Sequence, residues 1–432
     1  MILRGLLRLL YLTSGVALLF FFSSASAQDT KLLTLEQALQ TADAPHPDLQ
    51  IAEAERDTAL ADYALASARR DLSITFEGRL QGARSSLPDS SFTSDNSVRL
   101  SARKNLYDFG RSENNVGAAR AITEARDRSL LDARDQRRID IMARFFDVLL
   151  ADLQYVTDSE FMTVAFLNFD KARDNFNQKL IAKVDLSDLE SRFQNLLVKR
   201  NQTQIQQRLT RELLADAMNQ PGQLSADLED PKLPGNDRPL PNYEMLTALL
   251  DQSPQIQTSK NLLEASRRRM EAVRAENNPS VDAEVEAGDY FNRRLQGRDT
   301  VRAGVVLSWP IYQGSRVSAQ IAREQAQFHK LQAEAENLKR NLSQAVLKLL
   351  IETEQLQKST RNAAKVQADF RDLALERARA QYEVELKTNL GESAAATVET
   401  KLLQRGIEYQ LALNLAKLEA LLGRPLPKPE TK

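Results

Sequence analysis

The stretch VRAGVVLSWPIYQGSRVSAQ, residues 301–320, contains the pattern on which the rest of the chain is built. Its first part alternates apolar residues with other residues, which predicts a β-strand with one apolar face. Pro310 cannot donate a hydrogen bond to a neighbouring strand, and Gly314 permits a turn. No further proline occurs before Pro425, so a long helical region is expected after the turn. The apolar face of the predicted strand carries Val301, Ala303, Val305, Leu307 and Trp309.

The same plan occurs earlier, in VRLSARKNLYDFGRSENNVGAAR at residues 98–120. There too a strand pattern passes an aromatic residue and a glycine and leads into a proline-free run. Matching positions in the two halves lie at a nearly constant offset, which indicates a tandem duplication. The offset is 207 between Pro47 and Pro254 and between Ser73 and Ser280, 205 between Tyr107 and Tyr312, and 206 between Leu180 and Leu386.

The first residues have the features of a secretory signal peptide. Two arginines precede an apolar run of 14 residues, Leu9–Phe22, which is too short to span a membrane. Residues 25–27, ASA, form a cleavage site, so the mature chain is expected to begin near Gln28. The expected organisation is a signal peptide at 1–27, a first repeat at 28–220, a proline-rich linker at 221–241, a second repeat at 242–424 and a tail at 425–432.

Each repeat is expected to contain a helix, a β-hairpin and a pair of long helices. The hairpins are predicted at about 72–107 and 281–312. Between Gly110 and Pro221 there is no proline, and an unbroken helix of that length would far exceed a globular domain. A turn is therefore predicted at residues 180–187, LIAKVDLS. Before this turn, apolar residues with coiled-coil spacing predict a seam formed by Ile139, Met142, Phe146, Leu149, Leu153 and Val156.

The four strands have the length and the apolar face of membrane-spanning strands, which need roughly 9–11 residues each. Four strands cannot close a barrel, and open edges are not tolerated in lipid, so two or three copies of the chain would have to combine. The other face of the strands is ionisable and is expected to line a water-filled lumen, with Glu77, Arg79, Arg99, Arg103, Asp282, Glu284, Glu286 and Arg302. The aromatic residues expected at the membrane interface are Tyr107, Trp309 and Tyr312. An amphipathic sheet packed on a soluble core is the alternative.

The composition argues against most other functions. The chain has 432 residues, no cysteine and a formal net charge of −1, so neither disulfides nor nucleic-acid binding is expected. Its two histidines, His46 and His329, lie far apart in the sequence, and no metal or cofactor site is predicted. Glu284 and Glu286 could mimic a catalytic pair, but they alternate with small apolar residues as a lumen wall would. We therefore do not expect an enzyme.

From about Leu33 to Leu426 the chain resembles the TolC-type outer-membrane efflux protein family. The resemblance lies in LTLEQALQTADAPHPDLQIAEAE near the start, in the junctions NLYDFGR and PIYQGSR, in the helix tips FNQKLIAKVDL and QYEVELKTNL, and in LLGRPLP near the end. It implies an α+β membrane protein, in which four transmembrane strands per chain contribute to a trimeric 12-stranded β-barrel. Very long helices would continue the barrel as a periplasmic tunnel.

The resemblance also implies a function and partners. The chain would be a homotrimer in the outer membrane, in contact with its lipid, and would form the passive exit duct of a tripartite efflux or type I secretion system. Its partners would be a periplasmic adaptor protein and an inner-membrane pump of the RND or ABC type. The competing interpretation is a soluble periplasmic coiled-coil protein with a structural or adaptor role, which the alternating strands and the duplication disfavour.

In the family, polar links between the helix tips hold the periplasmic end closed. The positions that match are Asp185 in the first tip and Tyr382 and Lys387 in the second, and both donors suit a carboxylate. Asp188 and Glu392 are further candidates for this gate.

Several positions depart from the family pattern. Asn105 stands where the first junction usually has proline, and Lys179 and Glu385 stand where the tips usually have glycine. Gly391 and Ala394 occupy positions that in some members carry acidic residues constricting the pore. We therefore do not expect an acidic ring at these two positions.

Overall fold

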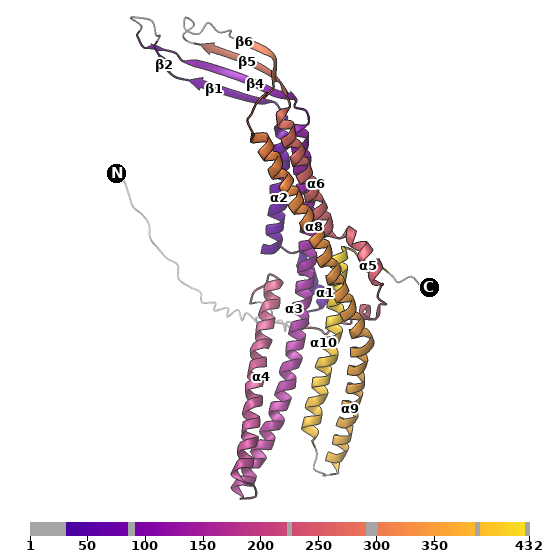
Figure 1. Cartoon of the computed structure of the whole chain (residues 1–432). Coiled ribbons are helices and arrows are strands. Elements are labelled where there is room, and N and C mark those ends of the chain that lie inside the picture. The colour runs from indigo at the N-terminus through magenta and orange to yellow at the C-terminus, as the bar shows by residue number, and fades with distance from the viewer. Residues whose placement is uncertain (1–31, 85–90, 223–226, 291–300, 385–388, 428–432) are drawn as a thin grey trace, which may run out of the picture.

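The computed structural model describes residues 32–84, 91–222, 227–290, 301–384 and 389–427. The predicted signal peptide and Lys387 lie outside these residues. The chain is elongated, with a β-sheet at one end and long helices that run from it to two tips at the other end (Figure 1). The predicted fold class, strands continued by very long helices, is confirmed for the chain.

The main sheet is antiparallel and has four strands in the order β1-β4-β5-β6. The first hairpin contributes β1 (Ser73–Arg79) and β4 (Ser97–Tyr107), and two short strands, β2 (Gly82–Ala83) and β3 (Thr93–Ser94), extend it. The second contributes β5 (Ser280–Tyr290) and β6 (Val301–Ser308). Because β4 pairs with β5, the two repeats join in the middle of the sheet, and β1 and β6 form its edges.

The last predicted strand is shorter than expected. The sequence predicts the second hairpin to about residue 312, but β6 ends at Ser308, two residues before Pro310. Proline has no backbone N–H for a ladder hydrogen bond, which accounts for the earlier end.

The helices repeat the same order in both halves. The first half has α1 (Leu35–Gln40), η1 (Thr41–Asp43), α2 (Pro47–Ala68), α3 (Arg111–Asn177) and α4 (Lys183–Ala217). Between the halves lies η2 (Pro234–Asp237). The second half has α5 (Tyr243–Leu249), η3 (Leu250–Gln252), α6 (Pro254–Arg274), η4 (Ala275–Asn277), α8 (Arg316–Gln355), the π-helical turn η5 (Leu356–Thr360), α9 (Arg361–Glu383) and α10 (Leu390–Leu422).

The turn between α3 and α4 begins slightly earlier than the predicted LIAKVDLS segment. Lys179 has a positive φ of 61°, a left-handed conformation that glycine adopts most easily. Its backbone N–H donates to Phe176 O, and the N–H of Leu180 donates to Asn175 O, as in a Schellman motif. The position that usually holds glycine therefore keeps the glycine conformation here with a lysine.

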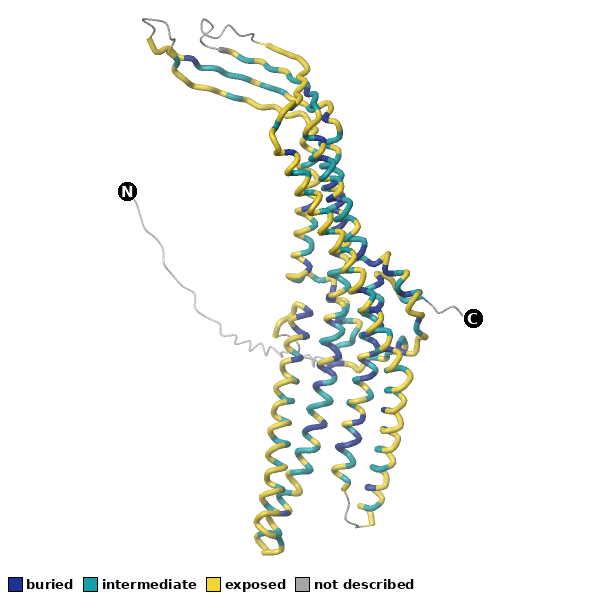
Figure 2. The backbone as a smooth tube through the Cα atoms, viewed as in Figure 1, coloured by how far each residue is buried: buried dark blue, intermediate teal, exposed yellow. Residues whose placement is uncertain are grey.

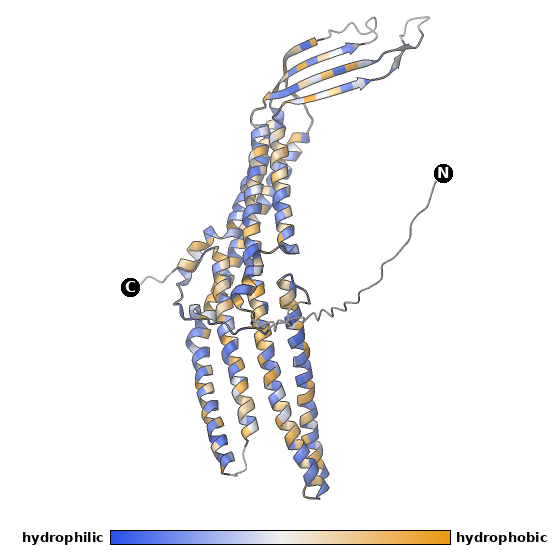
Figure 3. Ribbon diagram, turned by 180° about the vertical axis from the view of Figure 1, so that it is seen from behind, coloured by the Kyte–Doolittle hydropathy of each residue, from blue (hydrophilic) through white to orange (hydrophobic). Residues whose placement is uncertain are grey.

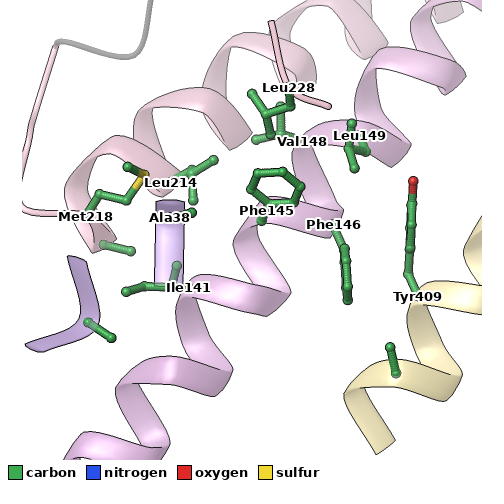
Figure 4. Packing of buried hydrophobic residues seen from close by; sticks show 13 residues of the cluster. Ala38, Ile141, Phe145, Phe146, Val148, Leu149, Leu214, Met218, Leu228 and Tyr409 are labelled. Atoms are coloured by element: carbon green, nitrogen blue, oxygen red, sulfur yellow. The ribbon is translucent and has the colours of Figure 1, made fainter. Parts of the chain in front are cut away.

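The main hydrophobic core lies halfway along the helices, where α1, α3, α4 and α10 meet (Figures 2 and 4). Phe146 of α3 stacks on Tyr409 of α10, with ring centroids 4.4 Å apart. A second cluster joins α5, α6, α8 and α10 around Leu250 and Val346. The sheet contributes to neither cluster.

The predicted coiled-coil seam of α3 is only partly right. Phe146 and Leu149 are buried, but Val156 is 44% exposed. A second row, Ile141, Phe145 and Val148, is fully buried. A seam describes a helix with one partner, whereas α3 is covered here by three helices, and its apolar surface is correspondingly wider. No helix within the described ranges is both long and apolar enough to cross a membrane.

Candidate functional site

Eight charged residues of the four strands meet on one face of the sheet, which we call the polar face, whereas Lys104 and Asp289 lie on the opposite face. The polar face carries all eight residues predicted to line a lumen: Glu77, Arg79, Arg99, Arg103, Asp282, Glu284, Glu286 and Arg302. The strand register places acids and bases opposite one another. Glu77 pairs with Arg99, Arg103 with Glu284, and Glu286 with Arg302.

One row of ion pairs crosses the whole sheet. Glu77 of β1 accepts hydrogen bonds from Arg99 of β4 and from Arg79, the latter at 2.8 Å. Arg99 lies 3.7 Å from a carboxylate oxygen of Glu286 on β5, and Arg302 of β6 donates to Glu286 at 2.9 Å. Each carboxylate therefore has a guanidinium partner on a neighbouring strand.

A second cluster lies nearer the helices. Arg103 donates to Asp282 at 2.7 Å, and its Nε lies 3.3 Å from Glu284. Asn105 also donates to Asp282, at 2.9 Å, and Asp282 is only 4% exposed. The usual proline at position 105 could not make this hydrogen bond, so the departure from the family pattern has a local structural role. With four acids and four bases in all, the polar face carries no net charge from the predicted residues.

The opposite face of the sheet is apolar and exposed, and we call it the apolar face. Phe76 is 70% and Leu307 65% exposed, and Ile74, Val285, Val301 and Val305 are exposed as well. Figure 3 shows hydrophobic and hydrophilic residues alternating along the strands. In water such a surface would be a strong aggregation liability, because large apolar patches on monomeric proteins are rare.

The predicted interfacial aromatics lie where the sheet meets the helices. Tyr107 is the last residue of β4, Trp309 directly follows β6, and both are exposed, as is Tyr312. Phe109, which the sequence analysis did not single out, packs against Tyr107 with ring centroids 4.7 Å apart. The sequence feature that could have pointed to Phe109 is its place in the junction motif NLYDFGR.

The junction between β4 and α3 is fixed by a buried carboxylate. Asp108 accepts a hydrogen bond from the backbone N–H of Ser112 at 2.9 Å and one from its hydroxyl group. These bonds satisfy donors in the first turn of α3, where the helix dipole also favours negative charge. A polar cavity of about 650 Å³ beside this junction is lined by Arg69, Arg103, Asn105, Arg111, Glu276 and Asp282, among others.

The described gate candidates lie on three helices: Asp185 and Asp188 on α4, Tyr382 on α9 and Glu392 on α10. Asp185 lies in the first turn of α4 and accepts a hydrogen bond of 3.4 Å from the N–H of Ala182. Asp188 pairs with Arg192 of the same helix at 3.0 Å, and Tyr382 is exposed near the end of α9. Within the described part of one chain, no hydrogen bond joins Asp185 to Tyr382.

Glu392, the remaining gate candidate, lines a cavity of about 550 Å³ between the two helix pairs, together with Phe161, Val164, Leu189, Arg192, Arg371 and Glu399. Its neighbour Gly391 is packed against α3. A Cβ atom at Gly391 would lie 2.7 Å from Cγ2 of Val164, so a larger residue would require Val164 or one of the two helices to shift. The glycine at a position that is acidic in some family members thus reflects close packing of two helices.

Among the residues that the structure describes, no cluster of histidines and carboxylates suitable for a metal ion is found.

Comparison with known proteins identifies the architecture. Residues 245–424, most of the second repeat, match the family model described as outer membrane efflux protein. No curated protein matches the sequence significantly. The solved structures with the same fold include the CmeC outer membrane channel of Campylobacter jejuni (14% identity, TM-score 0.74, 92% of this chain and 87% of that chain covered). A second is the outer membrane protein VceC of Vibrio cholerae, with 17% identity and a TM-score of 0.72, over 91% of this chain and 97% of that chain. A third is the open state of the MtrE outer membrane channel of Neisseria gonorrhoeae, with 18% identity and a TM-score of 0.70, over 92% of this chain and 91% of that chain. The family resemblance inferred from the sequence is thereby confirmed for the second repeat, and the fold is confirmed for the whole chain.

Proposed function

We propose that this protein is the exit duct of a tripartite efflux or type I secretion system. The premise is that the second repeat matches the outer membrane efflux protein family and that the whole chain has the fold of outer-membrane channels. It conducts substrate passively from a periplasm-spanning complex to the exterior. It does no chemistry of its own.

The observation that carries the proposal is the inverted polarity of the sheet. Apolar residues such as Phe76 and Leu307 are exposed, whereas Asp282 is buried. This distribution is stable when lipid covers the apolar face and water fills the space before the polar face. The soluble adaptor interpretation provides no lipid for the apolar face, so we reject it.

The sheet also requires further copies of the chain. Its edge strands, β1 and β6, have no partner strand on their outer sides in the described chain. Open edges are not tolerated in lipid, so β6 of one copy would pair with β1 of the next. Three copies close a barrel of twelve strands, which is wide enough for an open lumen. The helices of three copies would then surround a tunnel below the barrel.

The partners follow from the family. We assign a periplasmic adaptor and an inner-membrane pump of the RND or ABC type, and we place the helices in the periplasm. We also propose that Asp185 and Tyr382, with Lys387, help to close the tips. Among the residues that the structure describes, Asp185 accepts one hydrogen bond, of 3.4 Å, and a carboxylate can accept a further donor from a neighbouring chain.

The proposal is tested by the mass of the purified protein in detergent. We expect a homotrimer that resists dissociation without heating and that fractionates with the outer membrane. Native mass measurement of a monomer, or release of the protein with the soluble periplasm, would exclude the barrel and with it the duct.

A further inference from the structure

Lys104 is the one basic residue that the strand register places on the apolar face within the described part of the sheet. It lies on β4 opposite Ala283 of β5, whereas the adjacent Arg103 lies on the polar face. Its side chain is exposed, and no hydrogen bond or ion pair joins it to another described residue. Asp289, the described acid on the same face, lies six residues farther along β5, about 20 Å away. A charge that faces lipid is costly unless an anion or a polar group accompanies it.

The duplication indicates the depth at which Lys104 lies. The offset of 205 that relates Tyr107 to Tyr312 also relates Lys104 to Trp309. Trp309 is 63% exposed and belongs to the aromatic residues expected at the membrane interface. Because the two repeats build the same sheet, their equivalent positions lie at about the same depth. Lys104 is therefore at headgroup depth, where the first repeat has an ammonium group in place of an indole ring.

A β-bulge turns Tyr107 to the same face as Lys104. In a regular strand, residues 104 and 107 would point to opposite faces. The register between β4 and β5 shifts between Asn105 and Tyr107, so that Tyr107 lies opposite Val281, on the apolar face. An ammonium group and a phenolic hydroxyl group therefore come from the same stretch of β4. The residues opposite them, Ala283 and Val281, have no polar side-chain atoms.

Phe109 holds the ring of Tyr107. The two rings pack with centroids 4.7 Å apart. Phe109 has a positive φ of 55°, a conformation that is strained for a bulky side chain. Its equivalent in the second repeat, again at an offset of 205, is Gly314, with a φ of 62°. The first repeat thus keeps the glycine conformation with a phenylalanine, and strain of this kind is concentrated at functional sites.

The ligand that suits these groups is the headgroup phosphate of a phospholipid. An ammonium group donates up to three hydrogen bonds and a tyrosine hydroxyl group donates one, and phosphate oxygens accept both. A lysine on an apolar surface extends its side chain toward the headgroups, where phosphate is the anion within reach. A lipid with a net negative charge is favoured over a zwitterionic lipid, because a zwitterionic headgroup carries its own cation beside the phosphate.

We propose that Lys104 and Tyr107, held by Phe109, bind the phosphate of an anionic phospholipid in the membrane leaflet on the helical side of the sheet. The site is complete within one chain, since β4 lies between β1 and β5. A trimer has three such sites, and they alternate with three positions at which Trp309 replaces the base. The site rests on the proposed function in one respect: the apolar face must meet a bilayer.

The test measures which lipid lies beside each repeat by the quenching of tryptophan fluorescence. The chain has a single tryptophan, Trp309, so the fluorophore can be moved. The first reporter carries Leu106→Trp with Trp309→Phe, and the matched reporter carries Ile311→Trp with Trp309→Phe. Leu106 and Ile311 are equivalent at the offset of 205, and they are 53% and 89% exposed. Both proteins are reconstituted into vesicles of phosphatidylcholine and phosphatidylglycerol in which one of the two lipids is brominated, because bromine quenches tryptophan at short range.

For the first reporter we expect phosphatidylglycerol to associate about fivefold more strongly than phosphatidylcholine, as expected for one lysine among anionic headgroups. For the matched reporter the ratio of the two association constants should be about one. Lys104→Gln in the first reporter should lower its ratio to about one, and Lys104→Arg should preserve it. Tyr107→Phe should lower it by about half, because one donor is lost. The preference should weaken in about 1 M salt, which screens charges.

A ratio of about one in the first reporter, or a ratio that Lys104→Gln leaves unchanged, overturns the proposal. Inorganic phosphate at constant ionic strength should have no effect, and loss of the preference in its presence would assign a free anion to the site instead of a lipid. Both reporters retain Lys104, so their comparison and its salt dependence decide the outcome even where a variant at position 104 does not assemble. If neither brominated lipid quenches either reporter, the strands do not meet lipid and the proposed function fails as well. Quenching without a preference overturns the site alone.

Discussion

The sheet and the middle of the helices have opposite polarity. Around Phe146 and Tyr409 apolar side chains are buried and charges face outward, as in a water-soluble protein. In the sheet Phe76 and Leu307 are exposed while the acidic Asp282 is buried. The same chain therefore follows one rule, removal of apolar surface from water, in two surroundings. In a protein that is partly surrounded by lipid, the burial of residues within one chain therefore does not by itself identify which apolar residues are removed from water.

The largest effect is expected in the helical core. Phe146→Ala removes a ring that stacks on Tyr409 and leaves a cavity, so the free energy of unfolding should fall by about 3–5 kcal/mol. Phe76→Ala on the apolar face is the matched control. Lipid chains can fill the vacated space, so only the transfer free energy of the ring is lost, about 1.5–3 kcal/mol. Urea unfolding in lipid bilayers measures both, and equal losses would indicate that the apolar face packs against protein.

The next effect separates the two faces of the sheet. Val305→Arg places a charge on the apolar face in the middle of β6 and should cost about 2–4 kcal/mol near the bilayer midplane, whereas Leu307→Arg, close to the interfacial Trp309, should cost less. Ser308→Arg or Ser101→Arg, on the polar face, should be tolerated and should alter single-channel conductance instead. Equal tolerance on both faces would mean that the register is shifted by one residue, because such a shift exchanges the faces.

A smaller effect compares two acids of the polar face. Asp282→Asn removes the charge that Arg103 pairs with in a nearly closed site, and we expect a loss of about 1–3 kcal/mol. Glu284→Gln, whose side chain is more open to solvent, should cost about 0–1 kcal/mol. The difference is visible in the temperature at which the trimer dissociates. A larger loss for Glu284→Gln would show that burial does not control these pairs.

The smallest energies are expected at the tips, which belong to neither region. Asp185→Ala combined with Tyr382→Phe removes exposed polar groups worth about 0–1 kcal/mol each. We nevertheless expect a higher single-channel conductance in planar bilayers and greater sensitivity of cells to large antibiotics, because a trimer repeats the links three times. If conductance stays unchanged in intact trimers, the tips are closed by other residues, with Asp188 and Glu392 as the next candidates.

Much of the architecture could be predicted because it depends on local periodicity. Alternation along residues 301–308 and the offset of 205–207 between the repeats are properties of the chain order alone, and they predicted the four strands and the paired helices. The eight ionisable residues share a face for the same reason, since successive strand residues point to opposite sides. The helix turn was predicted at residues 180–187, and the residue with positive φ, Lys179, directly precedes that segment.

The tertiary structure alone decided which of these residues meet. Arg361 and Glu408 lie 47 positions apart, and Arg103 and Asp282 lie 179 apart, so no local pattern relates them. The wider buried surface of α3, with Phe145 and Val148, depends on how many helices cover it. The sequence alone shows that the helical path of the second repeat is one residue longer, because the offset rises from 205 at Tyr107 and Tyr312 to 206 at Leu180 and Leu386. The π-helical turn η5 that absorbs this residue, and the pairing of Arg361 with Glu408 as the one polar link between α9 and α10 among the described residues, depend on hydrogen bonds and packing between distant segments. These exist only in the folded chain.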